Sequence, residues 1–257
     1  MVVPMPGRNF RALISLSAPT ASRHSPEVLT KPIPAWILCG GTFLAACAGC
    51  INAAGLIGLH HQALSHMSGT AAILGAELAR AQYDAVWHAL LILSFFFLGC
   101  VLSGVLVHES TLQLGRRYGI ALICESALLF AATYLLVHGQ AAGDHLAAMA
   151  CGLQNALATN YSGAVIRTTH ITGIITDLGL AAGAALRRDR VDRRRAGLYV
   201  LLALGFVGGS VLGGLGYVAI GFNTLLFPAA LTGITGLGYT AYRIRQSRRT
   251  GPTRPPF

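Results

Sequence analysis

Long apolar runs alternate with short polar segments along this chain. A membrane-spanning helix needs about 20 mostly apolar residues to cross roughly 30 Å of hydrocarbon. The runs are continuous, whereas barrel strands alternate over segments of about ten residues, so helices are the better solution for the backbone. We therefore predict an all-α, polytopic helical membrane protein. Its six long spans are Trp36 to Gly58, Val86 to Val107, Gly119 to Val137, Leu146 to about Ile166, Leu198 to Ile220 and Thr224 to Tyr242.

Two shorter segments with polar starts, His66 to Arg80 and His170 to Leu186, leave the topology open. If both cross the bilayer there are eight spans, and if both re-enter there are six. The re-entrant arrangement places the termini and most basic loops in the cytoplasm and leaves only Arg80 outside, so it violates the positive-inside rule less. It favours six long spans plus two short interrupted or re-entrant helices. Segments of about 16 residues can still cross a thinned bilayer, which keeps the eight-span arrangement open.

A polar signature occurs once in each half of the chain. The first copy is Asn52 followed by Ser65-His66-Met67-Ser68-Gly69-Thr70, and the second is Asn155 followed by Thr169-His170-Ile171-Thr172-Gly173. The Asn positions are 155 − 52 = 103 residues apart and the His positions 170 − 66 = 104, so one insertion or deletion superposes them. The pattern predicts two repeats, at about 35–138 and 139–243. Many transporters are built from such repeats, with interrupted helices meeting near the bilayer midplane.

Each copy of the signature carries one histidine and one acid on a shared helix face. His170, Gly173 and Asp177 follow this spacing in the second copy, and His66 and Glu77 do so in the first. An ionised acid at the centre of a span costs about 2.5 to 3.5 kcal/mol, so it is normally functional or paired. The histidines could accept protons near neutral pH. The acids could take up a coupling cation or a proton.

Other polar residues complete this candidate pathway. Arg167 could bind an anionic group or neutralise Asp177, and the glycines would let backbone N–H groups approach a ligand at a helix start. The predicted substrate or ion pathway comprises Asn52, His66, Ser68, Gly69, Glu77, Asn155, Arg167, His170, Thr172, Gly173 and Asp177.

Structural roles are the alternative for several of these residues. Asn52 and Asn155 could hydrogen-bond across the repeat interface, worth about 0.6 kcal/mol each. Glu77 lies close to Arg80 in sequence and could be interfacial. Glu125 sits inside an apolar run without an obvious partner and is a second candidate for function. His88 and His145, near predicted span ends, are expected to be solvated.

Composition supports the membrane assignment. Only 11% of the 257 residues are charged and the mean hydropathy is +0.60, whereas a soluble domain carries about 25% charge. The net charge of +10 lies in short flanks, including the Arg187 to Arg195 loop, and this fits positive-inside loops that contact anionic lipids better than a nucleic-acid surface. Residues 1–34, rich in Pro, are predicted to be a flexible cytoplasmic lead. Residues 244–257 are predicted to be a disordered basic tail.

The six cysteines fall within or at the edges of apolar runs and are expected to pack as small hydrophobes. Cys47 and Cys50 have redox spacing but lack a soluble βαβ context or an activating charge. Nothing resembles a phosphate loop, a zinc-spaced cluster or a catalytic triad, so no cofactor is predicted and a membrane-embedded enzyme is disfavoured.

At these motifs the chain resembles the YoaK-type family of bacterial inner-membrane proteins, a family of unknown function. The resemblance covers about Trp36 to Tyr242. It is carried by Ala48-Gly49-Cys50-Ile51-Asn52-Ala53 with Ser68-Gly69, and by Gly152-Leu153-Gln154-Asn155-Ala156 with Arg167-Thr168-Thr169 and Thr172-Gly173. The family more often reads Thr-Gly-Asn where this chain has Ser68-Gly69-Thr70, a departure at Thr70. The resemblance implies a helical membrane protein of six spans and supplies no substrate.

These observations predict a small secondary transporter or solute channel with its site between the two interrupted segments. The alternative is a non-transporting membrane scaffold or sensor whose duplicated motif seals the repeat interface. The expected setting is the bacterial cytoplasmic membrane, with both termini cytoplasmic. The solute, the coupling ion and homo-oligomerisation stay open.

Overall fold

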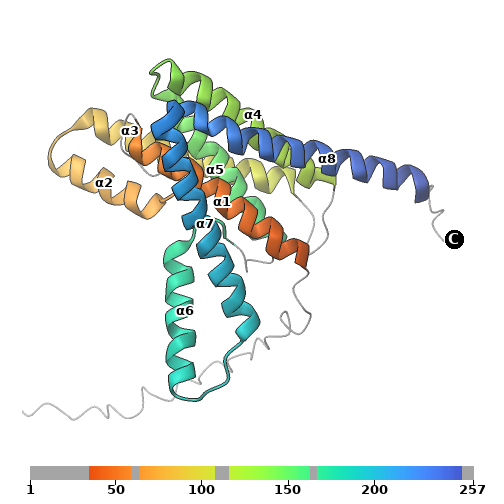
Figure 1. Ribbon diagram of the computed structural model, residues 1–257. Helices are drawn as coiled ribbons and strands as arrows, with labels where there is room; N and C mark the ends of the chain where they lie inside the picture. The colour runs from red at the N-terminus through yellow and green to blue at the C-terminus, as the bar shows by residue number, and fades with distance from the viewer. Residues whose placement is uncertain (1–34, 59–63, 108–115, 163–166, 251–257) are drawn as a thin grey trace, which may run out of the picture. The chain divides into compact units, whose positions relative to one another are not determined.

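The computed structural model describes residues 35–58, 64–107, 116–162 and 167–250, and all regular structure in these ranges is helical. This confirms the all-α prediction. The predicted lead, 1–34, and residues 251–257 of the predicted tail lie outside the described residues. In chain order the elements are α1 (Ala35–Ile57), α2 (Met67–Ala79), α3 (Tyr83–Leu106), α4 (Arg116–Val137), α5 (Ala142–Tyr161), α6 (Ile171–Leu186), α7 (Arg193–Ile220), the 3₁₀ turn η2 (Gly221–Leu225) and α8 (Leu226–Thr250) (Figure 1).

Four stretches of the described chain are long and apolar enough to cross a membrane, which is compatible with a multi-pass membrane protein. They are Leu38–Ile57, Tyr83–Leu106, Arg117–Val137 and Arg193–Gln246, the last of which contains both α7 and α8. Helix α5 lies in the region of the predicted span Leu146 to about Ile166, but it is not among these four stretches. Its polar residues, including Asp144, Gln154 and Asn155, lower its hydropathy. The count of six spans therefore stays a prediction.

Helix boundaries agree with the sequence at the short segments and differ at the chain end. Helices α2 and α6 begin directly after His66 and His170, as the polar starts predict. Helix α8 instead continues to Thr250, into the range 244–257 that we predicted as a disordered tail. No Gly or Pro lies between Gly238 and Gly251, so nothing in that stretch interrupts the helix.

The helices pack in pairs that join distant parts of the sequence. Helix α1 packs on α7, α3 on α5, and α4 on both α8 and α5, while α2 packs on α3 and α6 on α7. Figure 1 shows α4 and α8 side by side. Buried side chains from several of these helices form two apolar clusters. Ile51, Ile92 and Leu129 belong to the first cluster, and Leu122 and Leu153 belong to the second.

Glycines bring the paired helices into backbone contact. A side chain at Gly49 of α1 would collide with the backbone oxygen of Phe206 in α7, and one at Gly209 would collide with that of Ala46. The same contact continues at Gly213, which lies against the backbone of Cys50. Small residues permit such close approach between apolar helices.

The α3–α5 pair repeats this arrangement. A side chain at Gly99 of α3 would collide with the backbone oxygen of Met149, and one at Gly152 of α5 would collide with that of Phe96. Each crossing therefore has at least one glycine from each helix in backbone contact with the other.

Candidate functional site

Asn52, near the end of α1, binds the segment that precedes α2. Its side chain is 2% exposed. The Asn52 amide nitrogen donates to the Ala48 carbonyl at 2.9 Å and to the Ser65 hydroxyl, while its oxygen accepts from the Ser65 backbone N–H at 3.0 Å. The Nδ1 atom of His66 lies 3.4 Å from the same oxygen. Both ends of the amide are thus used inside the first motif.

His66 is half-buried at the N-cap position of α2. Its ring packs edge-on against Phe206 of α7, with centroids 5.6 Å apart. Burial lowers the pKa of its imidazole below the usual 6.5, because the charged form loses hydration. Ser68 and Gly69, in the first turn of α2, are exposed.

The second motif makes its contact through a different residue. Gln154 of α5, fully buried, accepts a hydrogen bond from the hydroxyl of Thr168 at 3.4 Å. The neighbouring Asn155, which the sequence aligns with Asn52, has a buried side-chain oxygen with no hydrogen-bond partner among the described residues. The adjacent glutamine therefore takes the place that the alignment gives to Asn155.

The other predicted pathway residues around the second motif's short helix are exposed or half-buried. Arg167, His170 and Thr172 are exposed. Gly173 lies against the His170 ring, with which any larger residue there would collide. The Thr172 carbonyl accepts from the Thr176 hydroxyl at 2.9 Å. This segment offers polar groups to its surroundings rather than to the helix core.

The two predicted acids each pair with an arginine outside the core. Asp177 of α6 lies 3.9 Å from Arg195 of α7, with 42% of the Asp177 side chain exposed. Glu77 lies 3.4 Å from Arg80 on the same helix, with 72% of the Arg80 side chain exposed. The partner of Asp177 is thus Arg195 and not Arg167. The Glu77 contact fits the interfacial alternative.

The described helices keep the two motifs apart. Helix α2 packs on α3 and helix α6 packs on α7, and α2 and α6 make no contact with each other. The predicted pathway residues therefore form two groups, one around Asn52 and one around Thr168. Ser68 and Thr172, in the first turns of α2 and α6, are both exposed.

Glu125 of α4 has the most unusual environment of the polar residues that the sequence offered. Its side chain is fully buried, and its Oε1 accepts from the Gln154 amide at 2.9 Å. Its Oε2 is buried with no hydrogen-bond partner among the described residues. Glu125, Gln154 and Thr168 thus form one chain of side-chain hydrogen bonds. The sequence signal for it is an unpartnered acid in an apolar run, followed by Gln and Asn in the next helix.

A second polar cluster joins the starts of α3 and α5, and the sequence did not predict it. His88 lies 3.6 Å from Asp144, and its Nδ1 lies 3.3 Å from Nε2 of His145. The two histidines are partly buried rather than solvated, because helix pairing brings the two starts together. Within the described ranges no group of three His, Cys, Asp or Glu is arranged to hold a metal ion.

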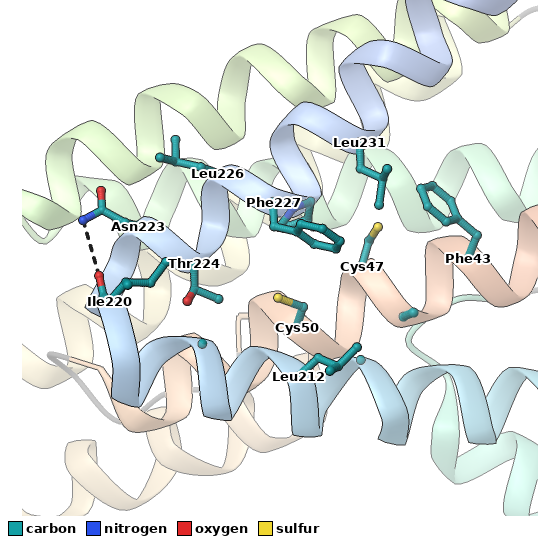
Figure 2. A pocket seen from close by; sticks show the side chains of 14 residues that line it. Phe43, Cys47, Cys50, Leu212, Ile220, Asn223, Thr224, Leu226, Phe227 and Leu231 are labelled. Carbon is teal, nitrogen blue, oxygen red and sulfur yellow. Dashed lines mark hydrogen bonds between the residues drawn. The ribbon is translucent and has the colours of Figure 1, made fainter.

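An apolar cavity of about 710 Å³ lies between α1, α7 and the beginning of α8. Figure 2 shows Cys47 and Cys50 from α1 among its lining side chains, together with Phe227 and Leu212. Both cysteines are buried and free. None of the predicted pathway residues lines this cavity. Its apolar walls suit hydrocarbon better than a polar solute.

A family model described as "Protein of unknown function (DUF1275)" matches residues 40–238. No curated protein and no solved structure shows a significant match to the chain. The matched range contains both motifs and all eleven predicted pathway residues.

Proposed function

The chain belongs to the DUF1275 family, the YoaK-type family that its two motifs indicated, and from this premise we propose that it is a small secondary transporter or solute channel. Its pathway runs between two repeats, in a domain of six long spans and two short helices. The proposed setting is the bacterial cytoplasmic membrane, with both termini cytoplasmic and the basic Arg187 to Arg195 loop against anionic lipids.

Helix pairing supports the duplication. If α1 to α4 form one repeat and α5 to α8 the other, the α1–α7 and α3–α5 crossings are the same contact made twice. Gly49 and Gly152 are 152 − 49 = 103 residues apart, the offset that also relates the two Asn positions. On the partner helices, Phe-x-x-Gly supplies both contacts, at Phe96 and at Phe206. Repeats of this kind commonly enclose a binding site.

The observation that carries the proposal is the pair of buried polar anchors. Asn52 and Gln154 are buried among the helices, and each binds the polar segment that precedes a short helix. Polar groups at membrane depth are costly, and they usually mark the route of a substrate or an ion. Ser68 and Thr172, in the first turns of the two short helices, are exposed.

Thiol labelling tests this proposal. In a variant lacking the six native cysteines, we would introduce Ser68→Cys or Thr172→Cys and add a membrane-impermeant thiol reagent from each side. Water in the pathway predicts labelling at both positions. Val105→Cys is the matched control, because Val105 is exposed on an apolar helix and should face lipid. Failure to label either position in folded protein would contradict the proposal.

A non-transporting scaffold or sensor is the second candidate, favoured by one observation. Asn52 uses both ends of its amide within the chain, as a residue sealing an interface would. In that case the motif is dry, neither introduced cysteine reacts, and His170→Ala lowers the thermal stability in detergent.

A further inference from the structure

Glu125 combines complete burial with an unused oxygen. It lies in the middle of α4, within the apolar stretch Arg117–Val137. One carboxyl oxygen accepts from Gln154, and the other has no hydrogen-bond partner among the described residues. A carboxylate in such a place loses its hydration and gains little in return. The protonated acid, which is neutral, suits this environment better.

The groups around Glu125 do not neutralise a negative charge. Three ionisable side chains are close enough to interact electrostatically with Glu125. They are Cys47 from α1, Cys151 from α5 and Tyr118 on α4 itself. From α8, the Tyr239 ring packs edge-on against the Tyr118 ring. On α3, the Cys100 thiol donates a hydrogen bond to the backbone carbonyl of Gly152 in α5. The turn η2 carries no ionisable residue. No described Arg, Lys or His forms an ion pair with Glu125.

A polar route leads from this carboxyl toward the second motif. Gln154 donates to Glu125 and accepts from Thr168, which is 1% exposed. The residue before Thr168 is Arg167, which is exposed. The hydrogen-bonded chain thus spans from the buried acid to the polar segment that begins α6.

We propose that Glu125 is a proton-binding site and that the proton is the coupling ion, an inference that rests on the transport function proposed above. Uptake forms one O–H bond on the Glu125 oxygen that Gln154 leaves free and converts the carboxylate to the neutral acid. Release breaks that O–H bond, passes the proton to water and restores the carboxylate, while the Gln154 amide keeps its own N–H bonds.

A metal cation fits this site less well than a proton. Hard cations require several oxygen ligands, whereas Glu125 is the only acid here and its described partner offers it an N–H group. A bound cation would face that donor. A proton needs only the free oxygen.

Infrared spectroscopy of the full chain in liposomes tests the proposal directly. Surface Asp and Glu are already ionised at neutral pH, so the difference spectrum between neutral and alkaline buffer should contain the carbonyl band of a protonated buried carboxyl group that disappears at alkaline pH. Glu125→Gln should lose this band while keeping the helical amide signal. The control, Asp189→Asn, replaces a surface acid paired with Arg187, outside the predicted pathway, and should leave the band unchanged. A wild-type spectrum without such a band, or a band that persists in Glu125→Gln, would overturn the proposal.

The two proposals can be contradicted separately. If the Glu125 band titrates but Ser68→Cys and Thr172→Cys stay unlabelled, Glu125 is a proton-binding site and the proposed pathway is wrong. If the two cysteines are labelled but the band is absent, the pathway is supported and the proton-binding site is wrong. Proton uptake into the same liposomes, abolished in Glu125→Gln and retained in Asp189→Asn, would support both proposals together.

Discussion

The two polar anchors have nearly the same place in the sequence and different surroundings in the structure. Asn52 satisfies its amide within its own half of the chain, through Ala48 and Ser65. Gln154 instead connects Thr168 to a buried acid on α4. We call Asn52 the closed anchor, because its hydrogen bonds stay within its own motif, and Gln154 the open anchor, because it also binds Glu125. A duplicated motif can therefore keep its position while its copies take different tasks, one holding a segment and one reaching an ionisable group.

The crossings that both halves share should be the most sensitive positions. Gly49→Leu and Gly152→Leu place a side chain against a backbone oxygen of the partner helix, so each should cost at least about 3 kcal/mol or prevent folding. Thermal unfolding in detergent, followed by gel filtration, measures the loss. Gly104→Leu is the control, because nothing lies near that glycine. An equal loss at Gly104 would mean that the tight crossings are not the cause.

Next in size is the contrast between the two asparagines. Asn52→Leu leaves the Ser65 N–H without its acceptor, and an unsatisfied buried group costs about 1 to 3 kcal/mol. Asn155→Leu removes an oxygen that already lacks a partner among the described residues, so it should be nearly neutral or stabilising. Comparing the two melting temperatures is the measurement. Equal destabilisation would contradict the difference between the anchors.

A smaller change separates the open anchor from the closed one. Thr168→Val removes the hydroxyl that bonds Gln154, at a cost of about 1 kcal/mol. Because Gln154 then loses the bond that positions its amide against Glu125, the infrared carbonyl band of the protonated Glu125 should shift. Ser65→Ala removes the corresponding hydroxyl of the first motif and should leave that band unchanged. An identical band in both variants would show that Thr168 does not act on Glu125 through Gln154.

The smallest expected effect concerns pH. Burial lowers the pKa of folded His66 below 6.5, so the unfolded chain binds more protons in that range and stability falls as the pH drops below about 6.5. His66→Gln should reduce this acid sensitivity by less than about 1 kcal/mol. Melting temperatures at neutral and mildly acidic pH measure it. His170→Gln, at an exposed position, is the control and should retain the full sensitivity.

Local features could be predicted from the sequence, and contacts between helices could not. The polar starts at His66 and His170 give the beginnings of α2 and α6 because helix entry depends on neighbouring residues. The structural alternative for Asn52 placed its hydrogen bonds across the repeat interface, whereas the bonds lie within its own half of the chain, to Ala48 and Ser65. The Asp177–Arg195 pair was missed because residue spacing along α6 does not reveal that α7 packs beside it. For the same reason Glu125 had a visible anomaly but no visible partner.

The glycine crossings have a consequence for how the two halves can be handled and how they can move. Helix α1 lies against α7 and α3 against α5, so each proposed repeat contributes a helix to both seams. Either half expressed alone would present two bare glycine-lined faces and should aggregate unless the other half is supplied with it. The same interlocking opposes rocking of one half as a rigid body. The short helices are then the parts that can move, because α2 packs only on α3 and α6 packs only on α7 among the described helices.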